Sequence, residues 1–301
     1  MNASSILQAA IDQAEARRRG EGALAPEDVA ALRCPACRAP LAAAQRALHC
    51  QGCQASWPLA DGLPQLYRES EVLGTDRLMR AIYDALPSWH DPLTAALAPL
   101  LQATTERRGR DRYMRRLDLE TIAPRPGQPI RVLDISVGSG ANLPYLRRDL
   151  PRDVPVEIWG VDLSRGMLSV CQRRMRRGAW PEVRLLLADA HALPFPDAFF
   201  DRVLNVGGIG GFRDPARALG EMARVARPET PIVVVDEQLD PAWRHSLVHR
   251  GAFRMITFYD ANPHCPREHL PPGAAPIVEE QISRYYYCLT FSMPAASEAS
   301  S

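Results

Sequence analysis

Three aspartates lie at or just after the ends of three apolar segments, where carboxylates can bind the hydroxyl and amino groups of a nucleotide. Asp134 ends the first segment, and Gly138 and Gly140 follow it. Asp162 ends the second segment, and Asp189 follows the third. A strand that leads through a glycine-rich turn into a helix is how α/β proteins hold a nucleotide, because glycine lets the backbone approach the ligand closely. The spacing therefore predicts a nucleotide-type site.

The elements that must position these aspartates are parallel strands and the helices that follow them. Val156–Asp162 is predicted to be a strand, and Ser164 is a plausible N-cap of the next helix. An acid at the tip of the second strand, about two dozen residues beyond the glycines, is placed to accept hydrogen bonds from ribose hydroxyls. Further strands are predicted at Val183–Leu187 and Phe200–Val206.

Together these segments resemble the class I S-adenosylmethionine-dependent methyltransferases, and most of all the branch with the ubiquinone and menaquinone biosynthesis C-methyltransferases. The family pattern has an acid and three spaced glycines after strand one, an acid after strand two, and Asp-Ala-x-x-Leu-Pro-Phe after strand three. The matching residues are Asp134, Gly138, Gly140, Asp162, Asp189, Ala190 and Leu193–Phe195. Ser136 replaces the first glycine, so we expect a slightly altered methionine pocket.

The resemblance implies a Rossmann-like α/β fold with a seven-stranded sheet and helices on both faces. It also implies how S-adenosylmethionine would bind. Gly138 and Gly140 would pass its methionine portion, Asp134 would tether the amino end, Asp162 would hold the ribose and Asp189 the adenine amino group. Ser136, Leu163 and Ala190 would complete the cofactor site, and Asn205 with the loop Val206–Phe212 would lie where substrate and methyl group meet.

The likeness extends over about residues 126–293. Ala216–Val225 is predicted to be a helix, Pro231–Gln238 a buried strand, and 276–293 the closing antiparallel hairpin. A dinucleotide site fits less well, because Leu143 stands where the third glycine of that fingerprint belongs. An α/β domain whose glycines serve only the turns is the remaining alternative.

Four cysteines near the N-terminus have the spacing of a zinc site. Cys34 and Cys37 form one C-x2-C knuckle, and Cys50 and Cys53 form a second after twelve residues. Two such knuckles place four thiolates tetrahedrally around one zinc ion, which leaves no open position for catalysis. A disulfide pair or a redox motif is less well supported, and we expect one structural zinc. Cys171, Cys265 and Cys288 are expected to be buried thiols.

The segment after the second knuckle extends this resemblance. Ser56–Tyr67, SWPLADGLPQLY, is similar to the end of the small zinc-ribbon activator proteins that dock onto methyltransferases. A zinc ribbon fused to a methyltransferase is also the architecture of a bacterial large-subunit rRNA guanine methyltransferase. That enzyme has a histidine among its zinc ligands, whereas this chain has four cysteines, so the likeness to it is architectural only.

Composition bounds the remaining possibilities. The chain has 301 residues, is 46% hydrophobic and has a formal charge of +1, so no strong global field attracts nucleic acid. It contains no lysine, which excludes a lysine base or Schiff base. No apolar run reaches membrane-spanning length, and the reduced thiols and absent export signal predict a cytoplasmic protein. The predicted parts are an N-terminal arm (1–27), zinc ribbon (28–68), helical cap (69–125), methyltransferase core (126–293) and disordered tail (294–301).

The helical cap is expected to cover the substrate side of the core. Its aromatic and basic side chains Tyr83, Trp89, His90, Arg112 and Tyr113 could line the pocket or serve only as core and surface. Two arginine runs could bind phosphates, although such runs are more often exposed helix faces. These are Arg107, Arg108, Arg110, Arg112, Arg115 and Arg116 in the cap, and Arg173, Arg174, Arg176 and Arg177 in the core.

No general base can be fixed from the sequence. His245 and His249 are four residues apart, which would place them on one helix face, and either is a candidate. Asn205 is the other candidate catalytic residue.

Three functions remain open. The first is methyl transfer to a small, largely apolar molecule, and it is favoured by the core resemblance and the near-neutral charge. The second is methylation of an RNA base, with the ribbon recognising RNA; it is less favoured because NVGG (Asn205–Gly208) replaces the Asn/Asp-Pro-Pro-Tyr motif of many base-amino methyltransferases. The third is a non-catalytic protein with a docking ribbon, which the retained acids and glycines disfavour. A homodimer stays open.

Overall fold

The computed structural model describes residues 25–44, 47–60, 62–87 and 106–295. Most of the predicted N-terminal arm, and most of the tail, lie outside these ranges. Among the described residues no helix is long and apolar enough to cross a membrane.

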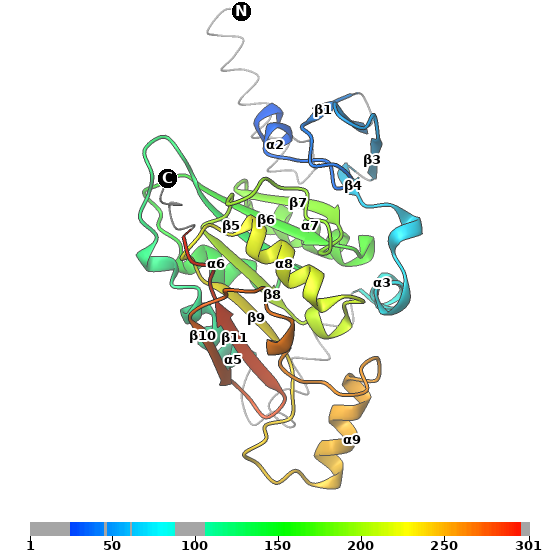
Figure 1. Ribbon diagram of the computed structural model, residues 1–301, viewed down its shortest axis with the longest axis vertical. Coiled ribbons are helices and arrows are strands. Elements are labelled where there is room, and N and C mark those ends of the chain that lie inside the picture. The colour runs from blue at the N-terminus through cyan, green and yellow to red at the C-terminus, as the bar shows by residue number, and fades with distance from the viewer. Residues whose placement is uncertain (1–24, 45–46, 61, 88–105, 296–301) are drawn as a thin grey trace, which may run out of the picture.

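A mostly parallel sheet forms the centre of the molecule (Figure 1). Its seven core strands have the order β7-β6-β5-β8-β9-β11-β10, and β11 runs antiparallel to both of its neighbours, β9 and β10. The bounds are β5 Ile130–Ile135, β6 Val156–Asp162, β7 Val183–Ala188, β8 Arg202–Val206, β9 Ile232–Glu237, β10 Ile277–Gln281 and β11 Tyr286–Phe291. The predicted Rossmann-like fold with its closing hairpin is therefore confirmed.

Helices connect the strands and cover the sheet. The predicted N-cap of helix α7 is present, because the Ser164 hydroxyl accepts a hydrogen bond from Met167 N at 3.1 Å. The α-helices are α2 Pro26–Ala30, α3 Gly74–Ala85, α5 Glu106–Arg116, α6 Leu143–Asp149, α7 Arg165–Gly178, α8 Pro215–Val225 and α9 Leu247–Ile256. The short 3-10 helices are η1 Glu69–Glu71, η2 Leu119–Thr121, η3 Ile209–Gly211 and η4 Arg267–His269.

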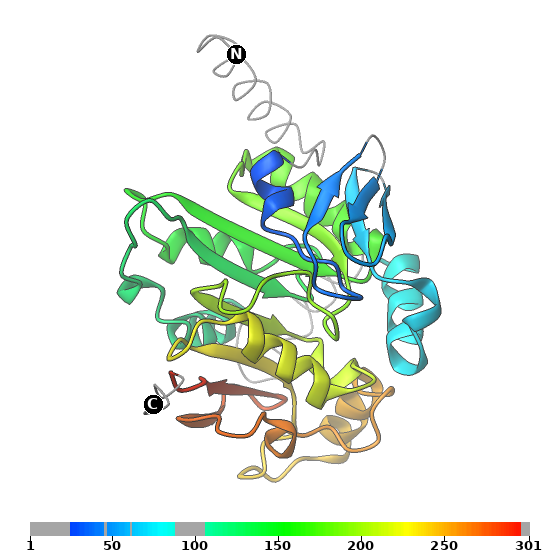
Figure 2. The same cartoon turned by 45° about the horizontal axis from the view of Figure 1, so that its top comes forward.

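The cysteine-rich segment extends the same sheet, so the sheet has eleven strands where the sequence predicted seven. Its strands are β1 Leu41–Ala43, β2 Ala47–Cys50, β3 Ser56–Ala60 and β4 Leu63–Leu66. β4 pairs in parallel with β7, with Gln65 opposite Leu187 and Leu66 opposite Ala188. The ribbon lies beside the β7 edge in both ribbon views (Figures 1 and 2). The sequence predicts too few strands because the pairing of β4 with β7 joins segments more than a hundred residues apart, and local patterns do not indicate such a pairing.

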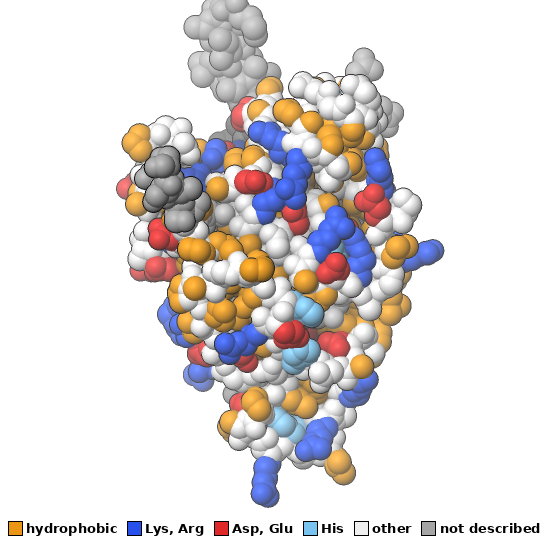
Figure 3. Space-filling model, viewed as in Figure 1, with side chains coloured by type: hydrophobic (Ala, Val, Ile, Leu, Met, Phe, Trp, Pro, Cys, Tyr) orange, Lys and Arg blue, Asp and Glu red, His pale blue; other side chains and the backbone are white. Residues whose placement is uncertain are grey.

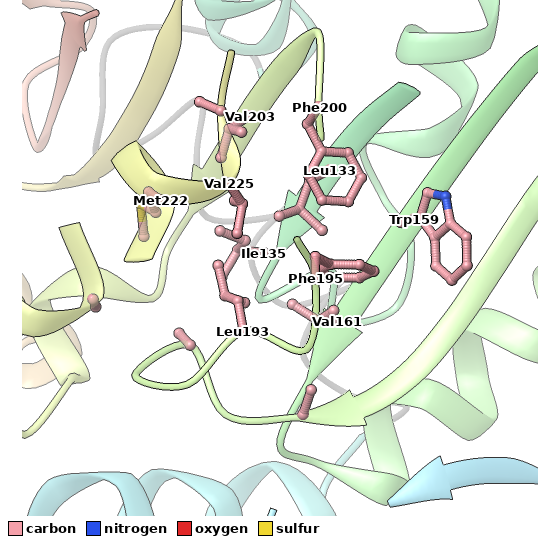
Figure 4. Close-up of a cluster of buried hydrophobic side chains, with 14 of the residues drawn as sticks. Leu133, Ile135, Trp159, Val161, Leu193, Phe195, Phe200, Val203, Met222 and Val225 are labelled. Atoms are coloured by element: carbon pink, nitrogen blue, oxygen red, sulfur yellow. The ribbon is translucent and has the colours of Figure 1, made fainter. Parts of the chain in front are cut away.

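Side chains from the ribbon and the α/β core share one buried cluster. Leu32, Leu48 and Trp57 of the ribbon belong to the same cluster as Phe195 and Phe200 of the core. The aromatic centre of that cluster is drawn in Figure 4, where the Trp159 and Phe195 ring centroids are 5.4 Å apart in an edge-on geometry. Edge-on aromatic pairs add stability beyond the area they bury. The ribbon is therefore packed onto the core as well as paired with it.

The turn after β5 has an unusual backbone. Ser136, Gly138 and Gly140 have φ angles of +57°, +53° and +76°. A Cβ at Gly140 would lie 2.6 Å from the sulfur of Cys171, so α7 can pack here only against glycine. The sequence motif thus reflects both a backbone angle and a close approach.

We expect Gly140→Ala to lower the free energy of unfolding by about 3 kcal/mol or more, because left-handed strain adds to a steric clash. Gly127→Ala is the matched control. Gly127 also has a positive φ, +70°, but a Cβ there would meet nothing within 4 Å. It should therefore cost only about 1–2 kcal/mol. Urea unfolding of both variants checks this, and equal losses would contradict the steric argument.

Candidate functional site

A cavity of about 270 Å³ lies at the carboxyl ends of the parallel strands. Strand order reverses between β5 and β8, and open α/β sheets bind ligands at such a switch point. The residues after β5, β6 and β7 line one half of the cavity, namely Ser136–Ser139, Asp162–Ser164 and Asp189–His191. The residues after β8 and β9, with the start of β11, line the other half, and they include Val206–Gly208, Phe212, Glu237, Tyr259, Ile282 and Tyr286.

Asp162 lies where the sequence predicted, at the tip of β6. Its two carboxylate oxygens accept hydrogen bonds from Gly138 N and Ser164 N, each at 2.8 Å. Burial raises the pKa of Asp162 to about 6, although these two amides favour the charged form. Each oxygen retains a further lone pair, and the side chain lines the cavity, so the carboxylate can accept two more hydroxyl groups.

Asp134 is fully buried beneath the β5 turn. Its Oδ1 accepts a long hydrogen bond from Asn142 at 3.5 Å, and its Oδ2 has no hydrogen-bond partner among the described residues. Burial raises the pKa of Asp134 to about 7. Asp134 is not among the described residues that line the cavity, and a buried carboxylate oxygen without a donor is unusual and costs stability.

Asn142 belongs to a polar network that reaches the cap. Tyr113 donates its hydroxyl to Asn142 Oδ1 at 2.7 Å, and Arg110 donates to the same oxygen. All three residues line the cavity. The predicted cap residue Tyr113 is therefore at the site, and Arg110 brings one positive charge of the α5 run to it.

Asp189 is held more tightly than the sequence indicated. Its Oδ1 contacts both the backbone N and Nδ1 of His191, at 2.9 and 2.5 Å, and its Oδ2 accepts from Arg213 at 2.8 Å. Burial alone would raise the pKa of Asp189, but the donors outweigh it and lower the pKa to about 2. Asp189 is therefore ionised, and Oδ2 retains a lone pair toward the cavity.

Helix α3 covers the β5–β7 half of the cavity and is bound to it at both ends. At its start Asp76 forms an ion pair with Arg213, which also binds Asp189. At its end Asp84 Oδ1 accepts from the Ser164 hydroxyl at 2.7 Å and from Gly166 N at 2.8 Å. The carboxylate of Asp84 thus binds the N-terminus of α7, where the helix dipole favours negative charge.

Of the other predicted residues of the helical cap, Tyr83 lines the cavity from α3, and Arg112 lies outside the cavity. Trp89 and His90 are not among the described residues.

The second half of the cavity has a carboxyl group that the sequence did not indicate. Glu237 ends β9, and its Oε2 accepts the Tyr259 hydroxyl at 2.9 Å while Oε1 accepts the Tyr286 hydroxyl at 3.3 Å. Burial and the neighbouring charge of Asp236 raise the pKa of Glu237 well above its usual value. A buried carboxyl group with a raised pKa beside an acceptor pocket is a candidate general base.

The predicted histidine candidates lie elsewhere. His245 precedes α9, whose N-cap is Ser246, so the prediction that His245 and His249 share a helix face is wrong. His245 Nε2 contacts Asp240 O at 2.8 Å, and His249 Nδ1 contacts the Ser246 hydroxyl at 2.8 Å. Both are absent from the described lining of the cavity.

Asn205 is fully buried below the loop after β8. Its amide donates to Ile135 O at 3.2 Å and to Ser136 Oγ at 3.3 Å. A Cβ at Gly208 would lie 2.3 Å from Ser136 Oγ, so serine replaces the family's glycine in a place where the facing loop has no side chain. Asn205 positions the turn from beneath and is absent from the described lining of the cavity, where it was predicted to act. Ser136, Leu163 and Ala190, which the resemblance implied for the cofactor site, do line the cavity.

The four ribbon cysteines converge. The Cys34 and Cys53 sulfurs are 3.7 Å apart, and those of Cys37 and Cys50 are 3.4 Å apart. Four thiolates bound to zinc at about 2.3 Å would be roughly 3.8 Å from one another. Gly52 N and Cys53 N each lie 3.3 Å from Cys50 Sγ, and burial alone would raise the pKa of that thiol, yet the donors lower it to about 6. The donor set fits one tetrahedral zinc ion.

The comparisons with known proteins agree with this geometry. Residues 133–234 match the family model described as a methyltransferase domain. Demethylmenaquinone methyltransferase of Thermus thermophilus is 38% identical over 42% of this chain and 56% of its own length. The Renibacterium salmoninarum enzyme of the same name is 33% identical over 53% of this chain and 63% of its own length. The chain thus spans little more than half the length of these curated relatives.

A solved structure shows the fold over a longer span. One chain of the Haloferax volcanii complex between the Trm112 methyltransferase activator and a methyltransferase has a TM-score of 0.53 and 14% identity, over 73% of this chain and 99% of its own. The fold and site define an α/β protein with a nucleotide-type cleft at its switch point. Residues 133–234 of this domain are similar to the methyltransferase-domain family.

The burial of Asp134 predicts a pH effect on stability. Folding raises the pKa of Asp134 from 3.8 to about 7. The contribution of Asp134 to the free energy of unfolding is therefore complete below pH 3.8 and is lost as pH rises through about 7. Asp134→Asn removes this loss. Between pH 5 and pH 8 the variant should gain roughly 2–3 kcal/mol of unfolding free energy relative to the unaltered protein. Urea unfolding at both pH values tests this, and a constant difference would refute it.

Proposed function

We propose that this chain transfers a methyl group from S-adenosylmethionine to a small, largely apolar, quinone-like molecule. The observation that most supports this is the division of the cavity at the switch point. Polar groups suited to a nucleoside line the β5–β7 half, and aromatic and apolar side chains line the β8–β11 half. The names of the relatives, demethylmenaquinone methyltransferases, support the choice of acceptor.

In this proposal each cofactor contact uses an atom that is free to accept. Asp162 binds the two ribose hydroxyls, Asp189 accepts the adenine amino group through Oδ2, and Asp134 attracts the cationic amino end of the methionine portion. The cofactor supplies an electrophilic methyl group, and the protein supplies alignment and exclusion of water. Helix α3, which is bound through Asp76 and Asp84, would exclude water from the β5–β7 half of the cavity.

Glu237 is the proposed general base. It is the carboxyl group among the described lining residues of the acceptor half, and its raised pKa suits proton uptake. A phenolic hydroxyl of the acceptor would give its proton to Glu237, which makes the ring a stronger nucleophile toward the methyl group. Tyr259 and Tyr286 hold the carboxylate in place. This assignment replaces the histidine candidates.

The zinc ribbon is proposed as a built-in activator. The Haloferax volcanii complex pairs a methyltransferase with a separate activator protein, according to its title. Here β4 pairs with β7 directly before Asp189. One zinc held by Cys34, Cys37, Cys50 and Cys53 would stabilise the ribbon, and the ribbon would stabilise the loop that meets the adenine. RNA methylation is the second candidate, supported only by the arginines of α5 and α7.

The cofactor assignment predicts that Asp162→Asn weakens S-adenosylmethionine binding roughly tenfold or more, because each charge-assisted bond is worth about 1.5–3 kcal/mol. Asp153→Asn, at an exposed aspartate, is the control and should bind normally. Isothermal titration calorimetry measures both. Equal affinities in the two variants would refute the assignment.

For the base, we expect Glu237→Gln to lower kcat by roughly a hundredfold or more while cofactor affinity is unchanged. Since the pKa of Glu237 is raised, the rate of the unaltered enzyme should increase with pH as this group loses its proton. The pH–rate profile of the variant should lack this rising limb. Tyr259→Phe removes a hydrogen bond that favours the ionised carboxylate, so it should move the limb to higher pH. The measurement is the rate of methyl incorporation into a demethylmenaquinol analogue as a function of pH. Methyl label that enters RNA instead would favour the second candidate function.

Zinc binding predicts about one zinc per chain by elemental analysis. Cys37→Ser should lower the zinc content and the Tm by about 5 °C or more, and weaken S-adenosylmethionine binding several-fold. Cys265→Ser changes a thiol outside the cluster and should retain the metal. Full zinc content in Cys37→Ser would contradict the ligand assignment.

A further inference from the structure

Helix α9 and its flanks form an exposed surface that the proposed methyl transfer does not use. In the described part of the chain, ten large apolar side chains are exposed, and half of them lie between Trp243 and Phe258. Leu247 and Val248 are 87% and 73% exposed. Single exposed apolar residues are normal, but such a concentration marks a contact surface. We call Trp243–Phe258 the α9 surface; its exposed apolar members are Trp243, Leu247, Val248, Met255 and Phe258.

In the part of the chain that the structure describes, one side of α9 is anchored to the core. Phe253 is buried and its ring lies 5.3 Å from that of Tyr285, whose hydroxyl donates to His249 O at 2.8 Å. These anchoring positions are four residues apart and define the inner face. The other side faces outward at the lower end of Figure 1.

The charge on this surface has one sign. Arg244, Arg250 and Arg254 are exposed, and the sequence has no acidic residue between Asp240 and Asp260. Apolar and arginine side chains therefore alternate over α9, as the lower end of the space-filling view shows (Figure 3). A basic amphipathic helix with exposed tryptophan, leucine and phenylalanine has the composition that binds in the plane of an anionic membrane surface.

A second recess lies beside the same surface. Trp243 lines it together with four arginines and two aspartates, and the Arg284 guanidinium lies 5.3 Å from the Trp243 ring. The arginines and aspartates are Arg108, Arg112, Arg115, Arg284, Asp111 and Asp240. Ile282 and Ser283 line both this recess and the main cavity. The recess thus places a net positive charge between the α9 surface and the site.

We propose that the α9 surface docks the protein onto a membrane that contains anionic lipids. Leu247, Val248 and Met255 would insert among the acyl chains, and Arg250 and Arg254 would meet the phosphates. Tyr259, which lines the cavity, directly follows Phe258, so the docked surface leads to the acceptor half of the site. Apolar side chains alone would suit a protein partner equally well; the one-sided positive charge favours the lipid surface.

The test uses the full chain without cofactor or acceptor, so its outcome is independent of the proposed methyl transfer. Flotation with phosphatidylcholine vesicles containing about 30% phosphatidylglycerol measures partitioning, and the blue shift of tryptophan emission gives a second readout. We expect binding that weakens as salt rises. The double variant Leu247→Ser, Val248→Ser should bind at least tenfold more weakly.

Two further variants separate the contributions. Leu73→Ser is the matched control, because Leu73 is 56% exposed but precedes α3, and it should bind vesicles normally. Arg250→Gln with Arg254→Gln should remove most of the dependence on phosphatidylglycerol, with roughly tenfold weaker binding. Thermal unfolding confirms that each variant is folded.

Three results would overturn the proposal. The first is no flotation of the unaltered chain, and the second is an equal loss in Leu73→Ser. The third is a dimer, seen by light scattering without lipid, that the Leu247 and Val248 substitutions dissociate; the α9 surface would then be an interface between two copies.

Discussion

The backbone leaves β5 through a left-handed turn, and the whole cavity is arranged around it. Ser136 and Gly138 turn the chain so that Gly138 N reaches Asp162, which aligns the ends of β5 and β6. Gly140 then allows α7 to pack directly on the turn. Because a packed interior tolerates little adjustment, Ser136 is accommodated only with glycine at position 208 opposite it. The departure from the family pattern at Ser136 therefore depends on the glycine that faces it.

The two halves of the cavity differ in how they hold their charges. On the β5–β7 side Asp189 is ionised because Arg213 and His191 donate to it. On the β9 side Glu237 accepts the Tyr259 hydroxyl and lies beside Asp236, and burial raises its pKa. One environment keeps its carboxylate ionised, and the other raises the pKa of its carboxyl group. This contrast is what an enzyme needs when one carboxylate binds and another exchanges protons.

The parts of this molecule that the sequence predicted depend on local patterns. Asp134, Asp162 and the Ser164 cap follow directly from strand ends and helix starts, and the cysteine knuckles follow from their spacing. The contacts that were not predicted join distant segments: Asp76 with Arg213, Glu237 with Tyr259, and β4 with β7. Periodicity also misled at His245, because Ser246 caps α9 and begins the helix one residue after it. A single sequence has no signal for which side chains meet across a fold.

The pairing of β4 with β7 has a consequence for how the activity of the protein would depend on its concentration. A separate activator must find its methyltransferase by diffusion, and the fraction bound falls on dilution. In the function proposed above both partners are on one chain, joined through η1 and α3, so their association is intramolecular and occurs at an effective concentration in about the millimolar range or above. The ribbon and core are thus always present in equal number, and dilution cannot separate them.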